Sequence, residues 1–504
     1  MISLTHTLHA TQKKDVQKKK NISKMKKYIT LALLFVVVGM LQASAMLIPP
    51  QIGNNMVLQQ NTDACLWGWV KPKTSVKIKC SWSNAEIKAK ADDKGAWKVT
   101  VATPAGSYTP QTITIEGDKQ TVTLTNVLIG EVWVASGQSN MEMPIKGFPA
   151  QFIDGSDKVI AFANQYKNKI RMATIPRNRT DALADTVRGD WKLCDPENVP
   201  DFSAVAYFFA ESLNRLLDVP VGIIHTSWGG TFVPEWMPKE STDKFNDIKA
   251  DIISKRFSHA VNKLFNGMVH PLANYTIRGF IWNQGESDAI IGDRNYHNHF
   301  AEMVKAWRAA FGQGELPMYC VEIPGHSYDD PNKCYAALER ELQWKGAALA
   351  GNCDVVSIID CMRPDQANDI HGSIKQPIGQ RLAWIAAAKT YGMTAIPHLY
   401  PRFEKMEVKG NTATLHFTNT QLGFTPNHDL QGFEVAGDDK VFYPAKAGED
   451  WSKHTINLCC DKVKEIKAVR YCFKNWTIGT VHNSQWLPLV PFRTDDWEIT
   501  PLKL

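Results

Sequence analysis

Between residues 129 and 395, short apolar runs alternate with helical patterns. Segments such as FSAVAYFFAESLNRLLD and YHNHFAEMVKAWRAAFG place apolar residues at helical spacing, and they lie between apolar runs of strand length: EVWVAS, VGIIHTS, RGFIWNQ, LPMYCVEI and DVVSIID. Nearly continuous apolar strands are typical of parallel sheets that are covered on both faces. The alternation therefore predicts an α/β fold in which helices cover both faces of an open parallel sheet, a three-layer α/β/α arrangement.

The segments on either side of this region have the pattern of β structure. Residues 46–128 contain short alternating or β-branched runs separated by Pro, Gly, Asn and Asp, which predicts a small β-sandwich-like domain. Residues 396–504 return to short strand patterns with turns between them, which predicts a C-terminal β-rich region. A chain of 504 residues is too long for one compact core. We therefore expect three parts after residue 45, with the site in residues 129–395.

The first 45 residues have the features of an export leader. From Met25, which we interpret as the true start, a basic opening precedes an apolar run from Ile29 to Leu41 and the tripeptide Ala43-Ser44-Ala45. A short apolar run that ends in an A-x-A site is typical of a secretory signal peptide. The alternative is a retained anchor, but the run is too short to span a bilayer comfortably. We expect a signal peptide over residues 1–45, no stable membrane span, and a periplasmic or extracellular protein.

Charge and cysteine content exclude two classes of function. The leader holds eight of the 57 basic residues and one of the 51 acidic residues, so the remainder is close to neutral. Nothing in it suggests nucleic-acid binding. The ten cysteines all follow the leader, and their even number permits disulfides whose pairing the sequence does not reveal. No Cys/His set has zinc spacing, so we expect no structural metal. The oligomeric state is not readable.

Polar residues follow four of the predicted strands directly or closely. Ser139 lies in the turn GQSNM after the first strand, and Gly229-Gly230 follow VGIIHTS. Asn283-Gln284 follow RGFIW, and Asp369-Ile370-His371 come shortly after DVVSIID. In open α/β sheets, sites form beyond the carboxyl ends of the strands. We therefore expect these groups to meet at one edge of the sheet.

Together these residue types are the parts that acyl transfer requires. A serine hydroxyl becomes a nucleophile when an imidazole removes its proton, and an acceptor on the other ring nitrogen orients that imidazole. Backbone N–H groups at glycines and a side-chain amide can stabilise the oxyanion. Each feature alone is more often a turn, a tight loop or a helix cap. Their occurrence together, in order and at strand ends, predicts a serine hydrolase.

The sequence resembles the SGNH (GDSL-like) hydrolase superfamily and, within it, the sialate O-acetylesterase family. The resemblance extends over nearly all of residues 46–504 and is carried by these blocks: MLIPPQIGNNMVLQQ, GEVWVASGQSNMEMPI, FSAVAYFFAESLNRLLDVPVGIIHTSWGGT, LFNGMVHPLANYTIRGFIWNQGESDA, DIHGSIKQPIGQRLAWIAAAKTYG and PFRTDDWE. It implies an exported serine esterase, without a cofactor, that removes O-acetyl groups from sialic acids through an acetyl-enzyme.

The resemblance also implies roles for individual residues. Ser139 would be the nucleophile, and His371 the general base and then the general acid. The oxyanion hole would consist of the Ser139 N–H, the N–H of Gly229 or Gly230, and the Gln284 side chain. Asn283, next to Gln284, is the less favoured donor.

Two departures from the family pattern affect the histidine loop. The triad acid usually lies three residues before the histidine, where this chain has Asn368, whereas the carboxylate of Asp369 lies two residues before it. Either Asp369 orients His371, or a main-chain carbonyl does so and leaves a Ser–His dyad. The family usually has Pro after the histidine, and this chain has Gly372.

Substrate recognition rests on the resemblance. Trp228, Trp236 and Trp282 flank the expected site and could stack on a sugar, although tryptophans beside strands more often pack in the core. Arg363 could meet a sialate carboxylate, although an exposed arginine is usually solvated. The partner we expect is an O-acetylated sugar or glycan. Two alternatives stay open: an esterase of the same mechanism acting on acetylated xylan or another polysaccharide, and a non-catalytic carbohydrate-binding protein. A zinc hydrolase is disfavoured because no H-E-x-x-H set occurs.

Overall fold

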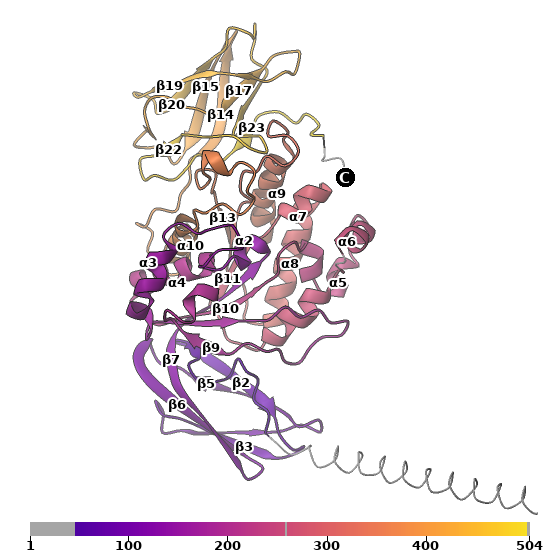
Figure 1. Ribbon diagram of the computed structural model, residues 1–504, viewed down its shortest axis with the longest axis vertical. Coiled ribbons are helices and arrows are strands. Elements are labelled where there is room, and N and C mark those ends of the chain that lie inside the picture. Colours follow the sequence, from indigo (N-terminus) through magenta and orange to yellow (C-terminus); the bar gives the residue numbers. More distant parts are fainter. Residues whose placement is uncertain (1–45, 258–259, 501–504) are drawn as a thin grey trace, which may run out of the picture. The chain divides into compact units, whose positions relative to one another are not determined.

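The computed structural model describes residues 46–257 and 260–500, so the predicted signal peptide lies outside the described residues (Figure 1). The described chain divides into two compact units. The smaller comprises residues 46–48, 67–99 and 114–123, and the larger comprises residues 49–66, 100–113 and 124–500. The N-terminal β unit is therefore discontinuous in sequence, and the C-terminal β region belongs to the larger unit. No helix in the described part of the chain has both the length and the apolar character needed to cross a membrane.

Strands form where the alternating runs of the N-terminal part predict them, and two further short strands, Val57–Gln59 and Glu86–Lys90, lie outside those runs. Their bounds are β1 (Val57–Gln59), β2 (Asp63–Trp69), β3 (Ser75–Cys80), β4 (Glu86–Lys90), β5 (Ala96–Ala102), β6 (Ser107–Gly117) and β7 (Gln120–Gly137). Strand β7 joins two runs that the sequence suggests are separate, because Gly130 is not a turn. A Cβ atom at Gly130 would lie 2.1 Å from the carbonyl oxygen of Pro220, so glycine permits close backbone contact here.

The central sheet has the predicted parallel α/β topology. Its order is β13–β12–β11–β7–β10–β8–β9, and every neighbouring pair is parallel except β8 and β9. The remaining bounds are β8 (Ile170–Thr174), β9 (Trp191–Leu193), β10 (Val221–Ser227), β11 (Gly279–Asn283), β12 (Met318–Val321) and β13 (Cys353–Val356). Ser227 and Asn283 both pair with Gly137. Three strands therefore end level with one another, directly before the predicted site residues.

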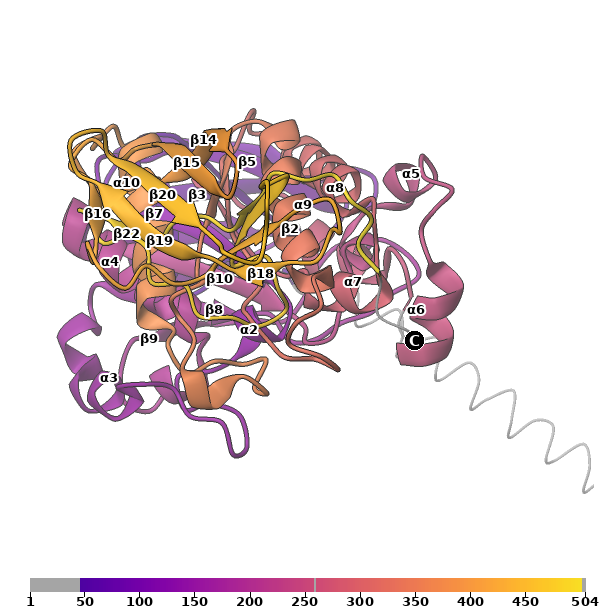
Figure 2. The same cartoon turned by 90° about the horizontal axis from the view of Figure 1, so that it is seen from above.

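Helices cover both faces of this sheet. The longer ones are α4 (Ala204–Leu217), α8 (Tyr296–Phe311), α9 (Tyr335–Ala350) and α10 (Gln376–Lys389). The shorter ones are α2 (Ser139–Glu142), α3 (Ser156–Phe162), α5 (Lys239–Thr242), α6 (Ala250–Phe257) and α7 (Glu286–Ile291). Figures 1 and 2 show α3 and α4 on one side and α8 with α5 and α6 on the other.

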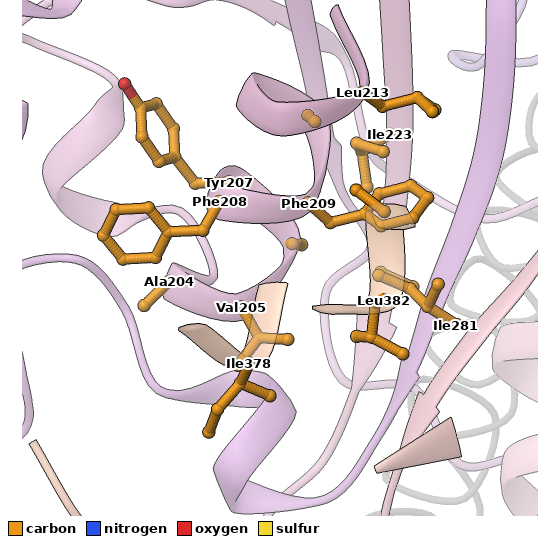
Figure 3. Close-up of a cluster of buried hydrophobic side chains, with 14 of the residues drawn as sticks. Ala204, Val205, Tyr207, Phe208, Phe209, Leu213, Ile223, Ile281, Ile378 and Leu382 are labelled. Atoms are coloured by element: carbon orange, nitrogen blue, oxygen red, sulfur yellow. The ribbon is translucent and has the colours of Figure 1, made fainter. Parts of the chain in front are cut away.

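Adjacent residues of β11 show how the two faces are buried. Ile281 packs in a cluster with α4 and α10, which Figure 3 shows with its labelled residues Ala204, Val205, Tyr207, Phe208, Phe209, Leu213, Ile223, Ile281, Ile378 and Leu382. Phe280 points to the other face, where its ring meets Trp307 and Phe311 of α8. The alternation of side chains along one strand thus anchors helices on both faces and holds the strand ends in place.

The C-terminal region consists of two antiparallel four-stranded sheets and a short two-stranded pair. One sheet orders β14 (Arg402–Lys409), β15 (Thr412–Thr418), β20 (Thr455–Cys459) and β19 (Lys446–Asp450), and the other orders β18 (Tyr443–Pro444), β17 (Phe433–Ala436), β21 (Ala468–Tyr471) and β23 (Phe492–Arg493). Strand β16 (Phe424–Thr425) pairs with β22 (His482–Asn483). Leu415 and Val435, from different sheets, share one buried core with Ile359 of the α/β region. The predicted β-rich region is confirmed.

Candidate active site

Ser139 follows a turn whose backbone conformation requires glycine at position 137. Strand β7 ends at Gly137, which has φ = +140° and no room for a side chain, because a Cβ atom there would lie 2.1 Å from the carbonyl oxygen of Asn283. Helix α2 begins two residues later at Ser139. Among the described residues, neither the Ser139 hydroxyl nor its backbone N–H has a hydrogen-bond partner. Both groups are available to a ligand.

The glycine turn after β10 packs directly against this serine. A Cβ atom at Gly229 would lie 3.2 Å from the Cβ of Ser139. The Gly229 N–H donates to Glu142 Oε2 at 2.8 Å, so this predicted oxyanion donor is engaged. Gly230 has φ = +75°, and in the described part of the chain its N–H has no partner. Of the two glycines that the sequence suggests, the structure leaves Gly230 as the available donor.

The Gln284 side chain, which the sequence predicts as the third donor, is bonded to acceptors within the protein in this structure. Gln284 is fully buried. Its Nε2 donates to the carbonyl oxygen of Thr231 at 2.9 Å and to Asp288 Oδ2, so both N–H bonds are used. Gln284 therefore holds the backbone next to Gly230. The neighbouring amide of Asn283 is also buried, and neither its nitrogen nor its oxygen has a partner among the described residues.

The ring of His371 is held by a glutamine that the sequence analysis missed. His371 Nδ1 and Gln151 Oε1 lie 3.0 Å apart, and Gln151 Nε2 donates to Asp369 Oδ1 at 2.7 Å. Because a carboxylate only accepts, the amide nitrogen faces Asp369 and the amide oxygen faces the ring. His371 Nδ1 must then carry the proton, which leaves Nε2 as the acceptor that a general base requires.

Asp369 acts on the ring only through Gln151, so the predicted direct contact between Asp369 and the ring is absent. Its Oδ1 also accepts from the backbone N–H of His371 at 2.9 Å, which fixes the loop rather than the imidazole. The arrangement is thus neither the expected triad nor a dyad oriented by a main-chain carbonyl. The loop Phe148–Gln151 supplies a second contact, since the Phe148 ring packs edge-on against His371 at 5.2 Å.

The serine turn and the histidine loop are tied together by Asn140. Its Nδ2 donates to the carbonyl oxygen of Ile370 at 3.0 Å and to Glu286 Oε1 at 2.5 Å. The residue after Ser139 is thereby bonded to the residue before His371. No hydrogen bond joins Ser139 Oγ to the ring in the described residues. Catalytic hydrogen bonds are often long without substrate and tighten when it binds.

The buried ammonium group of Lys375 lies near the serine turn and affects the pKa of His371. Lys375 Nζ donates to Asn140 Oδ1 at 2.6 Å. Burial lowers the pKa of Lys375 to about 8, and burial raises the pKa of Glu286. Burial first, and then the charges of Lys375 and His326, lower the pKa of His371 to about 4, against the opposing charges of Asp369 and Glu142. The imidazole is therefore neutral at pH 7 and able to accept a proton.

Of the predicted sugar-binding residues, Trp228 alone lies beside Ser139 with its ring partly accessible. The Arg177 and Arg179 guanidinium groups lie over its ring, 5.2 and 4.0 Å from the centroid. Arg177 also donates to both oxygens of Glu142, at 2.8 and 2.7 Å. The motif around Ser139 contains Glu142, so the sequence could have indicated this residue. Arg177 and Arg179 lie in no motif.

The other two predicted substrate contacts, Trp282 and Arg363, both have partners within the protein. Trp282 is only 1% exposed and packs against Trp236 and Trp307, so it belongs to the core beneath the site. Arg363 is half-exposed, but its Nη2 donates to Asp154 Oδ2 at 2.6 Å, so its charge already has a partner. The position after a buried strand was not sufficient to distinguish a core side chain from one at the edge.

Comparison with known proteins places these features in context. The family model described as "Carbohydrate esterase, sialic acid-specific acetylesterase" matches residues 129–387. The sialate O-acetylesterase of Homo sapiens is 27% identical over 485 residues, covering 88% of this chain and 91% of that protein, and that of Mus musculus is 25% identical over 514 residues, covering 88% and 93%. The crystal structure of a carbohydrate acetylesterase from Xanthomonas citri has 30% sequence identity and a TM-score of 0.80, covering 90% of this chain and 100% of that one.

Proposed function

Because this chain belongs to the family of sialic acid-specific carbohydrate acetylesterases, and is therefore a carboxylic ester hydrolase that acts on acetylated sugars, we propose that it removes O-acetyl groups from sialic acids. The observation that carries the serine mechanism is the bond between His371 Nδ1 and Gln151 Oε1. It fixes the tautomer in which Nε2 can take a proton from a serine.

The first half of the reaction forms an acetyl-enzyme on Ser139. His371 Nε2 takes the hydroxyl proton while Oγ attacks the acetyl carbonyl carbon. The oxyanion of the tetrahedral intermediate accepts hydrogen bonds from the backbone N–H groups of Ser139 and Gly230. The intermediate collapses, the C–O bond to the sugar breaks, and the sugar oxygen takes the proton from His371. Gln151 Oε1 stabilises the imidazolium that exists between these steps.

The second half returns the enzyme to its starting state. His371 Nε2 removes a proton from water, whose oxygen attacks the acetyl carbonyl carbon, and the same N–H groups donate hydrogen bonds to the oxyanion that forms. When this intermediate collapses, Ser139 Oγ leaves with the proton from His371, and acetate is released. Protons balance over the cycle, because each proton that His371 takes from Ser139 or from water is given to the oxygen that leaves.

Two arginines near Ser139 could contact an anionic sugar, and each also contacts a glutamate: Arg177 contacts Glu142, and Arg179 contacts Glu235. Arg177 and Arg179 lie over the two-ring system of Trp228, whose residue neighbour Gly229 packs against Ser139. An arginine fork suits a carboxylate such as that of a sialic acid. We assign this recognition to Arg177 and Arg179 because they lie over Trp228, next to the glycine that packs against Ser139; all three arginines, including Arg363, already contact a carboxylate.

We also propose that the protein is exported. The support is the leader: a basic start at Met25, a short apolar run and Ala43-Ser44-Ala45. N-terminal sequencing of the protein recovered from a native secretion or periplasmic fraction should begin at Met46. Recovery in the cytosol with the leader intact would refute export.

The test of the proposed function is acetate release by the purified protein and its Ser139→Ala variant. Both receive an O-acetylated sialic acid and an acetylated xylo-oligosaccharide, and Ser452→Ala, a change at an exposed serine in the C-terminal region, is the matched control. Turnover of the sialic acid ester that Ser139→Ala alone abolishes is the expected result. Serine-dependent turnover of only the xylan ester would replace the substrate, and turnover of neither would favour a carbohydrate-binding protein.

A further inference from the structure

A groove outside the serine site lies between the α/β region and the C-terminal β region. It has a volume of about 420 Å³. The loop after β13 forms one wall through Met362 and Pro364, and the C-terminal region forms the other through Trp476, Ile478 and Trp486. A pocket of this size with an apolar lining and a few polar groups is typical of a small-molecule site. Nothing in the reaction described above uses it.

We propose that this groove binds a further sugar ring of the glycan that carries the acetyl ester, so that the enzyme recognises an oligosaccharide rather than the acetylated sugar alone. This inference rests on the proposed function for its choice of ligand. A pyranose ring has an apolar C–H face and polar edges, which suits an aromatic platform bordered by hydroxyl and charged groups. Thr477 and Thr480 supply hydroxyl groups along the groove, and the carboxylate of Asp360, which also lines it, is paired with Arg381.

Trp486 has the features of such a platform. Its side chain is 58% exposed, although a large aromatic ring in water costs free energy unless it has a partner. The ring of His482 stacks on it with centroids 4.6 Å apart and an interplanar angle of 8°. One face of the indole is therefore covered by the protein, and the other is available to a planar apolar surface.

The backbone at Trp486 is held in a strained conformation that presents the ring. Its φ is +62°, a region that bulky side chains rarely adopt. The Asn483 carbonyl accepts from Trp486 N at 2.9 Å, and Asn483 Oδ1 accepts from the N–H groups of Gln485 and Leu487 at 3.1 and 3.0 Å. A turn that keeps such an outlier in place supports a binding role for the side chain it displays.

The His482 ring, on which the Trp486 indole stacks, is itself held by hydrogen bonds. His482 Nδ1 lies 2.9 Å from the Thr480 carbonyl oxygen and Nε2 lies 3.2 Å from Asp360 Oδ2, so both ring nitrogens are held. Arg381 donates to both carboxylate oxygens of Asp360, at 2.7 and 2.6 Å, and despite burial these partners hold the pKa of Asp360 well below its usual range. Little side-chain freedom is left to lose when a ligand binds, which favours affinity.

One residue of the groove contacts the loop that carries His371. Met362, one of its lining residues, would lie with its sulfur 2.6 Å from a Cβ atom at Gly372, the residue after the histidine. The glycine that departs from the family pattern thus leaves space for a groove residue. Gln366, two residues beyond Pro364, accepts from Ser373 N at 3.2 Å and from Ser373 Oγ at 3.3 Å. A sugar in the groove and an ester at Ser139 would border the same short loop.

Binding measurements on the Ser139→Ala protein test the subsite without turnover. We would titrate it with 3′-sialyllactose and with xylotetraose by calorimetry, in backgrounds that carry Trp486→Ala, Trp486→Phe or no further change. Trp451→Ala is the matched control, because Trp451 is 63% exposed in the same region and does not line the groove. We expect Trp486→Ala to weaken binding of sialyllactose about three- to tenfold, and Trp486→Phe and Trp451→Ala to change it less than twofold.

The outcomes separate this proposal from the proposed function. Binding that is equal in Trp486→Ala and its parent, or absent for both glycans, refutes the subsite even if the active enzyme releases acetate. Trp486-dependent binding of xylotetraose alone supports the subsite and refutes a sialylated ligand. With the active enzyme, the expected result is a raised KM for an O-acetylated sialyl-oligosaccharide with unchanged kcat, and an unchanged KM for the free O-acetylated sialic acid.

Discussion

In this structure Gln151 connects Asp369 to the His371 ring, an arrangement that we call the relay. Replacing Gln151 with leucine distinguishes this relay from a carboxylate bonded directly to the imidazole. Leucine has a similar size but neither accepts from His371 Nδ1 nor donates to Asp369. The backbone bond from Gln151 N to the Phe148 carbonyl oxygen, 2.9 Å long, stays in place, so the loop should keep its course. What is lost is the acceptor that orients the ring and stabilises the imidazolium during catalysis.

The size of the effect follows from the charge on the ring. A hydrogen bond to a charged group contributes about 1.5–3 kcal/mol, and each ~1.4 kcal/mol is tenfold in rate, so kcat should fall about 10- to 100-fold. Asp369→Asn should cost less than about tenfold, because an asparagine oxygen can still accept from Gln151 Nε2 and from His371 N. A carboxylate bonded directly to the ring would instead lose about 10⁴-fold on this substitution.

The assay is acetate release at saturating substrate, with melting temperatures measured in parallel. Gln165→Leu, at an exposed glutamine of the same region, is the control for the change of side chain. The relay is refuted if Gln151→Leu stays within twofold of the parent while Asp369→Asn loses three or more orders of magnitude. Loss of the same size in both variants, with unchanged melting, would mean that the two residues act as one unit.

Three further predictions concern the groups around this relay. The acidic limb of kcat/KM should lie near pH 4 rather than 6.5, because burial lowers the pKa of His371 and the base must be neutral to act; Lys375→Met removes a positive charge and should move that limb to higher pH. Gln284→Ala should lower the free energy of unfolding by about 1–3 kcal/mol, measured by urea denaturation, since it leaves the Thr231 carbonyl unpaired; an unchanged midpoint contradicts this. Trp282→Ala should destabilise the fold by about 3–5 kcal/mol, whereas Trp228→Ala should raise KM with little change in melting temperature; the reverse pattern would place Trp282 in the site.

The sheet and its polar edge were predictable because they depend on local patterns. Apolar runs of strand length between amphipathic helices have few ways to be buried other than a covered parallel sheet. Residues that directly follow such strands must then gather at one edge of the sheet. The sequence therefore predicts that Ser139, Gly229-Gly230 and Gln284 lie close together, and in the structure they follow strands that end level with one another.

The direction and partners of these side chains were not predictable from that pattern. Trp228 and Trp282 both neighbour strand ends, yet one lies beside Ser139 under two arginines and the other is closed in by Trp236 and Trp307. The amide of Gln284 turns inward to Thr231 because a nearby carbonyl and a buried carboxylate compete for it. One of these two acceptors, the carbonyl oxygen of Thr231, lies 53 positions away in the sequence.

The sequence by itself determined the α/β sheet, the order of its site residues and a serine at the end of β7, because strand and helix periodicity and turn chemistry are local properties of the chain. Only the tertiary structure decided which acceptor holds His371. Gln151 lies 220 positions away from it, in a loop without a motif, and it meets the ring because packing brings that loop against the histidine. A hydrogen bond of this kind depends on distance and direction in space, and these are properties of the folded chain alone.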